Sequence, residues 1–393
     1  MSEPLLNDGL AQTTLYPLDL RVTHAKGSRL FLDNGSSVID FISGIGASSF
    51  GHSHPEITQA IHEQVDKHLH VMVYGEMRQS AQDEAAIALL DLLPINLDSV
   101  YFVNSGAEAI DAAMKLVRRT THRQKIIAFK GGYHGNTFGA LSVSSNAERK
   151  APFQPLVGGI ELLEWNDHAS LELIDEQTAG VLVETIQGDA GIRIPDSDWI
   201  SKLRNRCTET GAHLILDEIQ CGFGRTGKAF AFEHFKIVPD HLCLGKALGG
   251  GMPMGALVSS RKHLQQFAHS PSLGHITTFG GHPVPCAASA VASKLLKQTN
   301  WDRVEAVGKK IESTLLDCSN VIALRRKGLY IAVELGSAEQ VNRVVQTCLE
   351  RGVLLFYFLS TPDAFRIAPP LNINDEDLQA ALSTIVDVIE ARA

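Results

Sequence analysis

The feature that most constrains the fold of this chain is a series of short apolar segments separated by longer amphipathic ones. Helical patterns such as 107–121 and 198–211 lie between several of the apolar segments. Short strands that are apolar throughout and spaced by helices are typical of a mostly parallel sheet that is covered on both faces. The sequence therefore predicts an α/β fold with strands at SVYFV (99–103), KIIAF (125–129), GVLVETI (180–186), HLILDE (213–218), HLCLG (241–245) and ALVSS (256–260).

The pattern changes towards both ends of the chain. Residues 28–41 predict a hairpin that turns at Asn34-Gly35 and packs with the C-terminal part of the chain. After about residue 283 the sequence predicts a smaller α+β domain, with helices at 283–299, 301–318 and 374–391 and strands at 329–335, 353–358 and 365–369. We therefore expect residues 1–50 and 283–393 to build a small domain and residues 51–282 to build a large one.

Composition limits the classes of function that fit the chain. A net charge of −9 argues against a surface for nucleic acid or anionic membranes. The first twenty residues lack the pattern of a secretory signal, and no apolar run is as long as a membrane span, so we expect a cytoplasmic protein. The six cysteines form no C-x-x-C pair, which favours free buried thiols and predicts neither a disulfide nor a metal site.

The stretch LILDEIQCGFGRTGK (214–228) contains two patterns associated with nucleotide binding. G-F-G-R-T-G fits the dinucleotide fingerprint, but Asp217–Cys221 separate the strand from the first glycine and little helical amphipathicity follows the third. The segment from Gly222 to Lys228 is nearly a P-loop, but Ala229 stands where a hydroxyl would bind Mg²⁺. Both nucleotide interpretations are therefore disfavoured.

Asp217 and Lys246 are more informative than the glycines. Asp217 ends an apolar strand, where active sites of open parallel sheets gather, and Lys246 follows another apolar run, HLCLG. A single carboxylate there can simply cap a turn, but a lysine beside a buried strand end is costly unless it is paired or used chemically. Pyridoxal phosphate (PLP) chemistry requires this combination. The amine forms the Schiff base, and the carboxylate keeps the pyridine nitrogen protonated.

A phosphate site for such a cofactor is predicted at NSGAEA (104–109). This segment follows the strand at 99–103 and opens a helix, and Ser105 with Glu108 matches a capping box. The backbone N–H groups of Ser105, Gly106 and Ala107 would lie at the positive end of the helix dipole, which suits a phosphate. Alone, the pattern indicates only a capped helix; beside Asp217 and Lys246 it predicts the phosphate site.

Seven segments of the chain occur in the order seen in class III aminotransferases, and the resemblance extends from residue 51 to residue 371. They are FVNSGAEAIDAAMKLVRR, GGYHGNTFGA, ETIQGDAG, LILDEIQCGFGRTG, LGKALGGGMPMGA, TTFGGHP and FRIAPPL. The resemblance is strongest to the acetylornithine, ornithine and 4-aminobutyrate group. It implies the aspartate-aminotransferase-like PLP fold, with a large PLP-binding domain and a small domain from both termini. It also implies a homodimer whose active sites lie at the interface.

The resemblance implies roles for residues around the cofactor. Lys246 resembles the Schiff-base lysine that also moves the substrate proton, and Asp217 resembles the partner of the pyridine nitrogen. The remaining expected contacts are Gln220 with the ring hydroxyl, Tyr133 with the ring face, Glu184 near the ring, Ser105, Gly106 and Ala107 with the phosphate, and Thr278 with the phosphate of the neighbouring subunit.

Arg366 resembles the arginine that grips the α-carboxylate of glutamate or 2-oxoglutarate, a task that suits a planar bidentate fork. An ion pair near a Pro-Pro turn is its alternative role. For His134, next to Tyr133, we expect a structural role.

Two residues depart from the family pattern. Family members usually carry an arginine for the far carboxylate of the substrate where this chain has Asn136. Candidate replacements are Arg78, Arg193 and Arg225. Asp189 stands where ornithine-type members have a glutamate that can pair with the substrate-binding arginine. Both departures raise the hypothesis of a donor without a second carboxylate, such as a diamine.

The function expected from this resemblance is a ping-pong transamination from an amino acid or ω-amine to a 2-oxo acid, with 2-oxoglutarate held by Arg366. Alternatives within PLP chemistry are a glutamate-semialdehyde-type aminomutase and a biotin-pathway diaminopelargonate-type aminotransferase, which YHGNTFGALSV resembles. A protein of the same fold that has lost catalysis is disfavoured because Asp217, Gln220 and Lys246 are all present.

Overall fold

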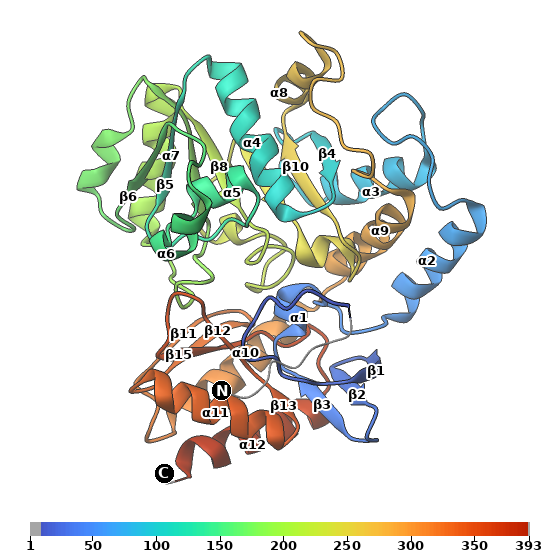
Figure 1. Cartoon of the computed structure of the whole chain (residues 1–393), viewed down its shortest axis with the longest axis vertical. Helices are drawn as coiled ribbons and strands as arrows, with labels where there is room; N and C mark the ends of the chain where they lie inside the picture. The colour runs from blue at the N-terminus through green and yellow to red at the C-terminus, as the bar shows by residue number, and fades with distance from the viewer. Residues whose placement is uncertain (1–8, 392–393) are drawn as a thin grey trace.

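A computed structural model describes residues 9–391 and confirms the α/β prediction (Figure 1). A seven-stranded sheet forms the centre, in the order β4-β10-β9-β8-β7-β5-β6. All six predicted strands are present, and β6 had not been predicted. The bounds are β4 (Ser99–Val103), β5 (Lys125–Phe129), β6 (Ile160–Leu163), β7 (Thr178–Glu184), β8 (His213–Asp217), β9 (His241–Leu244) and β10 (Gly255–Ser259).

The sheet is parallel except at β10, which runs antiparallel to both β4 and β9. Only residues 245–254 connect β9 to β10. A parallel connection needs a crossover of about a dozen residues or more, so this short segment forces the strand to reverse.

Helices cover both faces of this sheet. Alternate residues of each strand point to opposite faces, so Ile126 and Ala128 pack with α4 (Gly106–Thr121), whereas Ile127 and Phe129 join the core on the other side. That second core receives α7 (Ser197–Thr210), α9 (Pro283–Lys297) and α3 (Ser80–Leu90). The shorter helices α5 (Phe138–Val143), α6 (Ala147–Lys150) and α8 (Arg261–Leu264) lie in loops between strands.

Two four-stranded sheets lie below the large sheet in Figure 1. The first, in the order β1-β2-β3-β13, contains the predicted hairpin, whose strands pair in antiparallel fashion. The second has the order β11-β12-β15-β14. The bounds are β1 (Val22–Lys26), β2 (Arg29–Leu32), β3 (Ser37–Asp40), β11 (Ala323–Lys327), β12 (Tyr330–Glu334), β13 (Val353–Leu354), β14 (Phe356–Tyr357) and β15 (Ala364–Ile367).

The single strand predicted at 353–358 is divided between these two sheets at Leu355. Through β13, which pairs with β3, the C-terminal part of the chain completes the N-terminal sheet. The helices α10 (Trp301–Leu316), α11 (Ala338–Glu350) and α12 (Asp375–Glu390) belong to the same half of the molecule.

The boundaries of the two domains stay a prediction. Helix α9, which the sequence assigned to the small domain, packs against α3 and against α2 (Pro55–Lys67). Across residues 9–391, no helix has both the length and the apolar character that crossing a bilayer would demand.

Candidate active site

The carboxyl ends of β7 and β8 lie side by side at one edge of the large sheet. Glu184 ends β7, Asp217 ends β8, and the two residues are paired in register. Both side chains are buried and line a cavity of about 250 Å³. The cavity brings together seven of the residues expected around a cofactor: Gly106, Ala107, Tyr133, Glu184, Asp217, Gln220 and Lys246.

Asp217 is held in place by hydrogen bonds to both of its carboxylate oxygens. Nδ1 of the buried His134 donates to Oδ2 at 2.7 Å, and the backbone N–H of Ile219 donates to Oδ1 at 2.9 Å. Burial disfavours a charged imidazole, but the hydrogen bond to Asp217 and the charges of Asp217 and Glu184 outweigh it and raise the pKa of His134. His134 therefore fixes the orientation of the carboxylate. The sequence predicted a structural role for His134 but did not identify Asp217 as its partner.

Glu184 is a second buried carboxylate beside Asp217. Its oxygens accept from the backbone N–H groups of Tyr133 at 3.0 Å and Gly188 at 2.8 Å. Burial, with the nearby charge of Asp217, raises the pKa of Glu184 to about 7 despite these bonds and the charge of His134. Glu184 thus ties the loop at 132–136 to the sheet edge and can exchange a proton near neutral pH.

Lys246 reaches the same cavity from the segment that follows β9. Its backbone φ of 47° lies in the left-handed region, which costs a lysine about 1 kcal/mol or more. Burial, followed by the positive charge of Arg366, lowers the pKa of Lys246 to about 8. The side chain therefore offers a neutral amine more readily than a lysine in water.

The amino end of α4, where the sequence predicts the phosphate site, borders the cavity through Gly106 and Ala107. Ser105 is the N-cap, and its hydroxyl accepts from the backbone N–H of Glu108 at 3.2 Å. A carboxylate oxygen of Glu108 accepts from the backbone N–H of Asn104 at 2.7 Å. In a standard capping box the donor would be the backbone N–H of the N-cap residue, here Ser105, so this donor lies one residue earlier in the chain. As the first residues of the helix, Gly106 and Ala107 have N–H groups with no acceptor inside the helix. These groups can bind an anion.

Close packing explains why residue 106 is glycine. A Cβ there would lie 2.6 Å from the side chain of Ile219, in the loop that follows Asp217. The amino end of α4 and the end of β8 are therefore in contact, and this contact fixes the anion site relative to the carboxylate.

Arg366 lies on β15, with its guanidinium 4.6 Å from the centre of the Phe358 ring. Its Nη2 is 3.7 Å from Oδ1 of Asp189, and its buried Nε has no hydrogen-bond partner within residues 9–391. Asp189 also accepts from the backbone N–H of Leu359 and the hydroxyl of Ser360, both at 2.8 Å. The shorter acid at position 189 therefore still reaches the arginine, which keeps donors free for a carboxylate.

Asn136 is exposed at the mouth of the cavity and donates to the hydroxyl of Tyr133 at 3.2 Å. The arginines suggested as replacements at this position are engaged elsewhere. Arg78 pairs with Asp83 on the surface, and Arg193 lies over the ring of Trp165. The sequence missed another arginine: Arg149 of α6 borders a small hollow together with Tyr133, Asn136, Asp189 and Ser360.

Arg225 has a structural position inside the glycine-rich loop. It is fully buried and donates to the carbonyl oxygens of Leu329 and Pro369 and to the hydroxyl of Ser49. The Arg225 side chain therefore joins the loop at 222–227 to the residue before β12, to the segment after β15 and to Ser49. Thr278 is exposed and outside the cavity of its own chain.

Comparisons with known proteins agree with the chemistry of this cavity. Residues 11–389 match the family described as Aminotransferase class-III. The chain is a class-III aminotransferase. It is 39% identical to the acetylornithine aminotransferase of Methanopyrus kandleri, over 93% of each chain. It is 34% identical to the [LysW]-aminoadipate semialdehyde/glutamate semialdehyde transaminase of Sulfurisphaera tokodaii, over 92% of each chain.

A solved ornithine aminotransferase from Toxoplasma gondii has the same fold, with a TM-score of 0.88 and 29% identity over 97% of this chain and 92% of that one. In that crystal structure, PLP is present at partial occupancy at the active site. The likeness confirms the predicted aminotransferase fold, with the large mostly parallel sheet at its centre.

Replacing Lys246 tests its lowered pKa. In the protein without cofactor, Lys246→Met is expected to raise the free energy of unfolding at pH 7 by about 1–3 kcal/mol, because a buried ammonium is removed. The unfolded chain binds more protons than the folded one between the lysine's ordinary pKa of 10.5 and its lowered value of about 8. Wild-type stability therefore rises with pH across this window, and the advantage of the variant fades.

Denaturant unfolding of the two proteins at pH 7 and pH 10 measures this difference. Lys67→Met, at an exposed position in α2, is the control and should change stability little at either pH. A Lys246→Met protein that is no more stable than wild type at pH 7 would contradict the assignment.

Proposed function

We propose that this aminotransferase uses PLP and works by a ping-pong mechanism, taking the amino group of an ω-amine donor and passing it to 2-oxoglutarate. The observation that carries the proposal is that Lys246, Asp217 and the amino end of α4 all face one cavity. These are the three groups that the cofactor needs: an amine, a carboxylate for the ring nitrogen and a cradle for the phosphate.

The residues fit PLP in charge as well as in position. The N–H groups of Gly106 and Ala107 suit its phosphate, and Asp217 still has acceptor capacity beside its bonds to His134 and Ile219. When bound, PLP supplies an electron sink for the carbon that loses its proton. Tyr133 also lines the cavity, and an aromatic ring is suited to covering a flat ligand.

The protein's own part in the reaction is to position groups and move protons. The Nζ atom of Lys246 would hold the cofactor and, once a donor amine has replaced it there, would be free to take up and return the proton of the substrate carbon. Its lowered pKa leaves the free amine available as a base. Asp217, oriented by the hydrogen bond from His134, would stabilise positive charge on the ring nitrogen.

Arg366 is proposed to bind the α-carboxylate of 2-oxoglutarate. Before the acceptor enters, Asp189 offsets part of the arginine's charge at 3.7 Å, a distance too long for a good hydrogen bond. Asp189 accepts hydrogen bonds from Leu359 and Ser360. A substrate carboxylate can therefore replace Asp189 as the partner of the Arg366 guanidinium, and Asp189 still keeps hydrogen-bond donors.

We propose an Nα-acylated basic amino acid, N-acetylornithine or a close analogue, as the donor. Relatives named for acetylornithine support this choice. Arg149 supports it as well, since its positive charge lies beside Asn136, where the far carboxylate of such a donor would end. A diamine, which the neutral Asn136 suggested, is the competing donor.

Steady-state kinetics with 2-oxoglutarate and a panel of donors tests this proposal. We expect kcat/KM for N-acetylornithine to exceed that for ornithine, putrescine and 4-aminobutyrate by about 10-fold or more. Arg149→Ala should lower the value for N-acetylornithine about 10-fold or more and leave that for putrescine unchanged. A preference for putrescine in the wild type would overturn the donor assignment.

The same assays separate the alternative enzymes. Product formation without any 2-oxo acid would indicate an aminomutase. Turnover only with S-adenosylmethionine as donor would indicate the biotin-pathway enzyme.

Substitution of Arg366 tests the acceptor site. Arg366→Lys is expected to raise KM for 2-oxoglutarate about 10–100-fold, because a lysine cannot form the bidentate pair with a carboxylate. The half-reaction with putrescine, which has no carboxylate, should keep its rate. Arg351→Lys, at an exposed position, is the matched control. An unchanged KM in Arg366→Lys would place the acceptor carboxylate elsewhere.

We also propose a homodimer in which Thr278 contacts the cofactor phosphate of the partner subunit. Its surroundings support this, because Leu273, Ile276 and Phe279 of the same segment are exposed apolar side chains. The molar mass of the purified protein, measured by light scattering, tests this assembly. A mass equal to that of one chain would exclude the proposed homodimer.

A further inference from the structure

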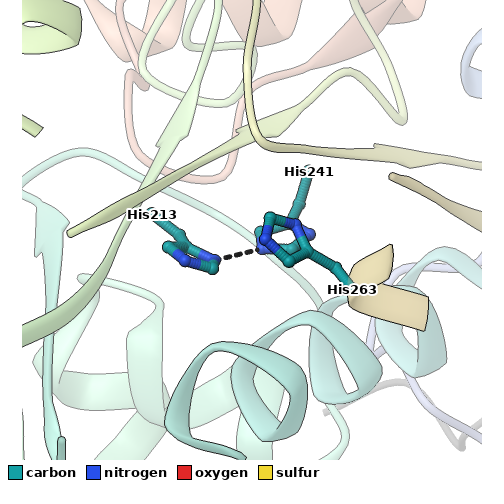
Figure 2. Close-up of side chains that lie close together, drawn as sticks. All are labelled: His213, His241 and His263. Atoms are coloured by element: carbon teal, nitrogen blue, oxygen red, sulfur yellow. Dashed lines mark hydrogen bonds between the residues drawn. The ribbon is translucent and has the colours of Figure 1, made fainter. Parts of the chain in front are cut away.

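Three histidine side chains converge at the edge of the large sheet opposite the active site. His213 is the first residue of β8, His241 is the first residue of β9, and His263 lies in α8. Figure 2 shows the three imidazole rings close together. One nitrogen atom from each ring lies within 4.8 Å of the other two. Residues so far apart in the chain form no metal-binding motif, so the sequence did not reveal the cluster.

The spacing of the rings is close to that of three imidazoles around one zinc ion. The ring centres are 4.7, 5.0 and 5.3 Å apart. Zinc binds imidazole nitrogen at about 2.0–2.1 Å in tetrahedral geometry, which places the nitrogens about 3.3 Å and the ring centres about 5 Å apart. Nδ1 of His213 and Nε2 of His241 are 2.8 Å apart, so this pair would need to open by about half an ångström.

The hydrogen bonds around the cluster leave nitrogen lone pairs for a metal. His213 and His241 share one proton between the two nitrogens that face each other, and a metal ion can replace that proton. Ser259 donates its hydroxyl proton to the carbonyl oxygen of Asp240, so Nδ1 of His263, at 3.5 Å, can only donate to Ser259. Nε2 of His263 then carries no proton and is free to bind.

Charged groups also surround the cluster. The charged groups that face the rings are Asp240, which favours a cation, and Arg204, Arg123 and Lys262, which oppose one. Arg204 is itself paired with Asp240 at 2.7 Å.

We propose that His213, His241 and His263 bind one transition-metal ion of the zinc type, with water at the fourth position. Three neutral imidazoles suit zinc and disfavour magnesium or calcium, which prefer oxygen ligands. The ion would link the beginnings of β8 and β9 to α8. Asp217 lies at the far end of β8, about 13 Å along the strand, so the metal stabilises the fold and takes no part in amino transfer.

Zinc titration of the holoenzyme, stripped of metals and of free cofactor, tests the proposal. Calorimetry should show one equivalent of Zn²⁺ per chain, and saturating Zn²⁺ should raise the thermal unfolding midpoint by several degrees. The rate of amino transfer should change less than about 2-fold. The zinc result therefore does not depend on whether the proposed amino donor is correct.

Two variants locate the site. His263→Ala and His213→Ala should each weaken Zn²⁺ binding about 100-fold or more, whereas His168→Ala, at an exposed histidine, should not. Co²⁺ should give the visible bands of a tetrahedral site in the wild type and in His168→Ala only. Retained amino transfer shows that each variant is folded.

If either alanine variant fails to fold, the other variant and the Co²⁺ spectrum of the wild type decide the question. Absence of stoichiometric Zn²⁺ binding, or equal binding by the wild type and a folded alanine variant, would overturn the proposal. The cluster would then be a hydrogen-bonded histidine pair with a third ring packed against it.

Discussion

The register between β7 and β8 is the constraint on which the active site depends. It places Glu184 directly beside Asp217, so two carboxylates meet at a buried sheet edge. Two neighbouring buried anions are costly unless protons or donors compensate them. His134 donates a hydrogen bond to Asp217, and the backbone N–H groups of Tyr133 and Gly188 donate to Glu184. The loop at 132–136 is therefore held in place by the need to satisfy these two acids.

A similar balance of charges holds for Lys246, which lines the cavity, and for Arg366. Lys246 and Arg366 lie close enough for the arginine's charge to help lower the pKa of the lysine. Asp189 offsets the arginine only partly, at 3.7 Å. The result is a reactive amine and an arginine with free donors. The buried amine and the incompletely paired arginine both lower the stability of the fold, and they are useful only when the cofactor and the substrate carboxylate are present.

Much of the fold was predictable because the central strands are uniformly apolar. Strand β6 was missed because it lies at the sheet edge and has Glu161 inside its run IELL, whereas the charged residues of β5 and β8 stand at the ends of those strands. Asp217 and Lys246 could be singled out from the sequence because Asp217 ends an apolar strand and Lys246 comes soon after another. The role of His134 was not, because its partner is 83 residues away in sequence. Arg149 and the histidine cluster likewise depend on contacts that only the folded chain creates.

The central claim is that Lys246 and Asp217 form a working cofactor site. The absorption spectrum of the purified protein, recorded before and after addition of glutamate, tests it most directly in the wild type and in Lys246→Ala. The account predicts a visible cofactor band in the wild type that bleaches with glutamate and recovers with 2-oxoglutarate. Lys246→Ala should not complete this cycle. A wild-type protein that shows no such band even after PLP is added would contradict the account at its centre.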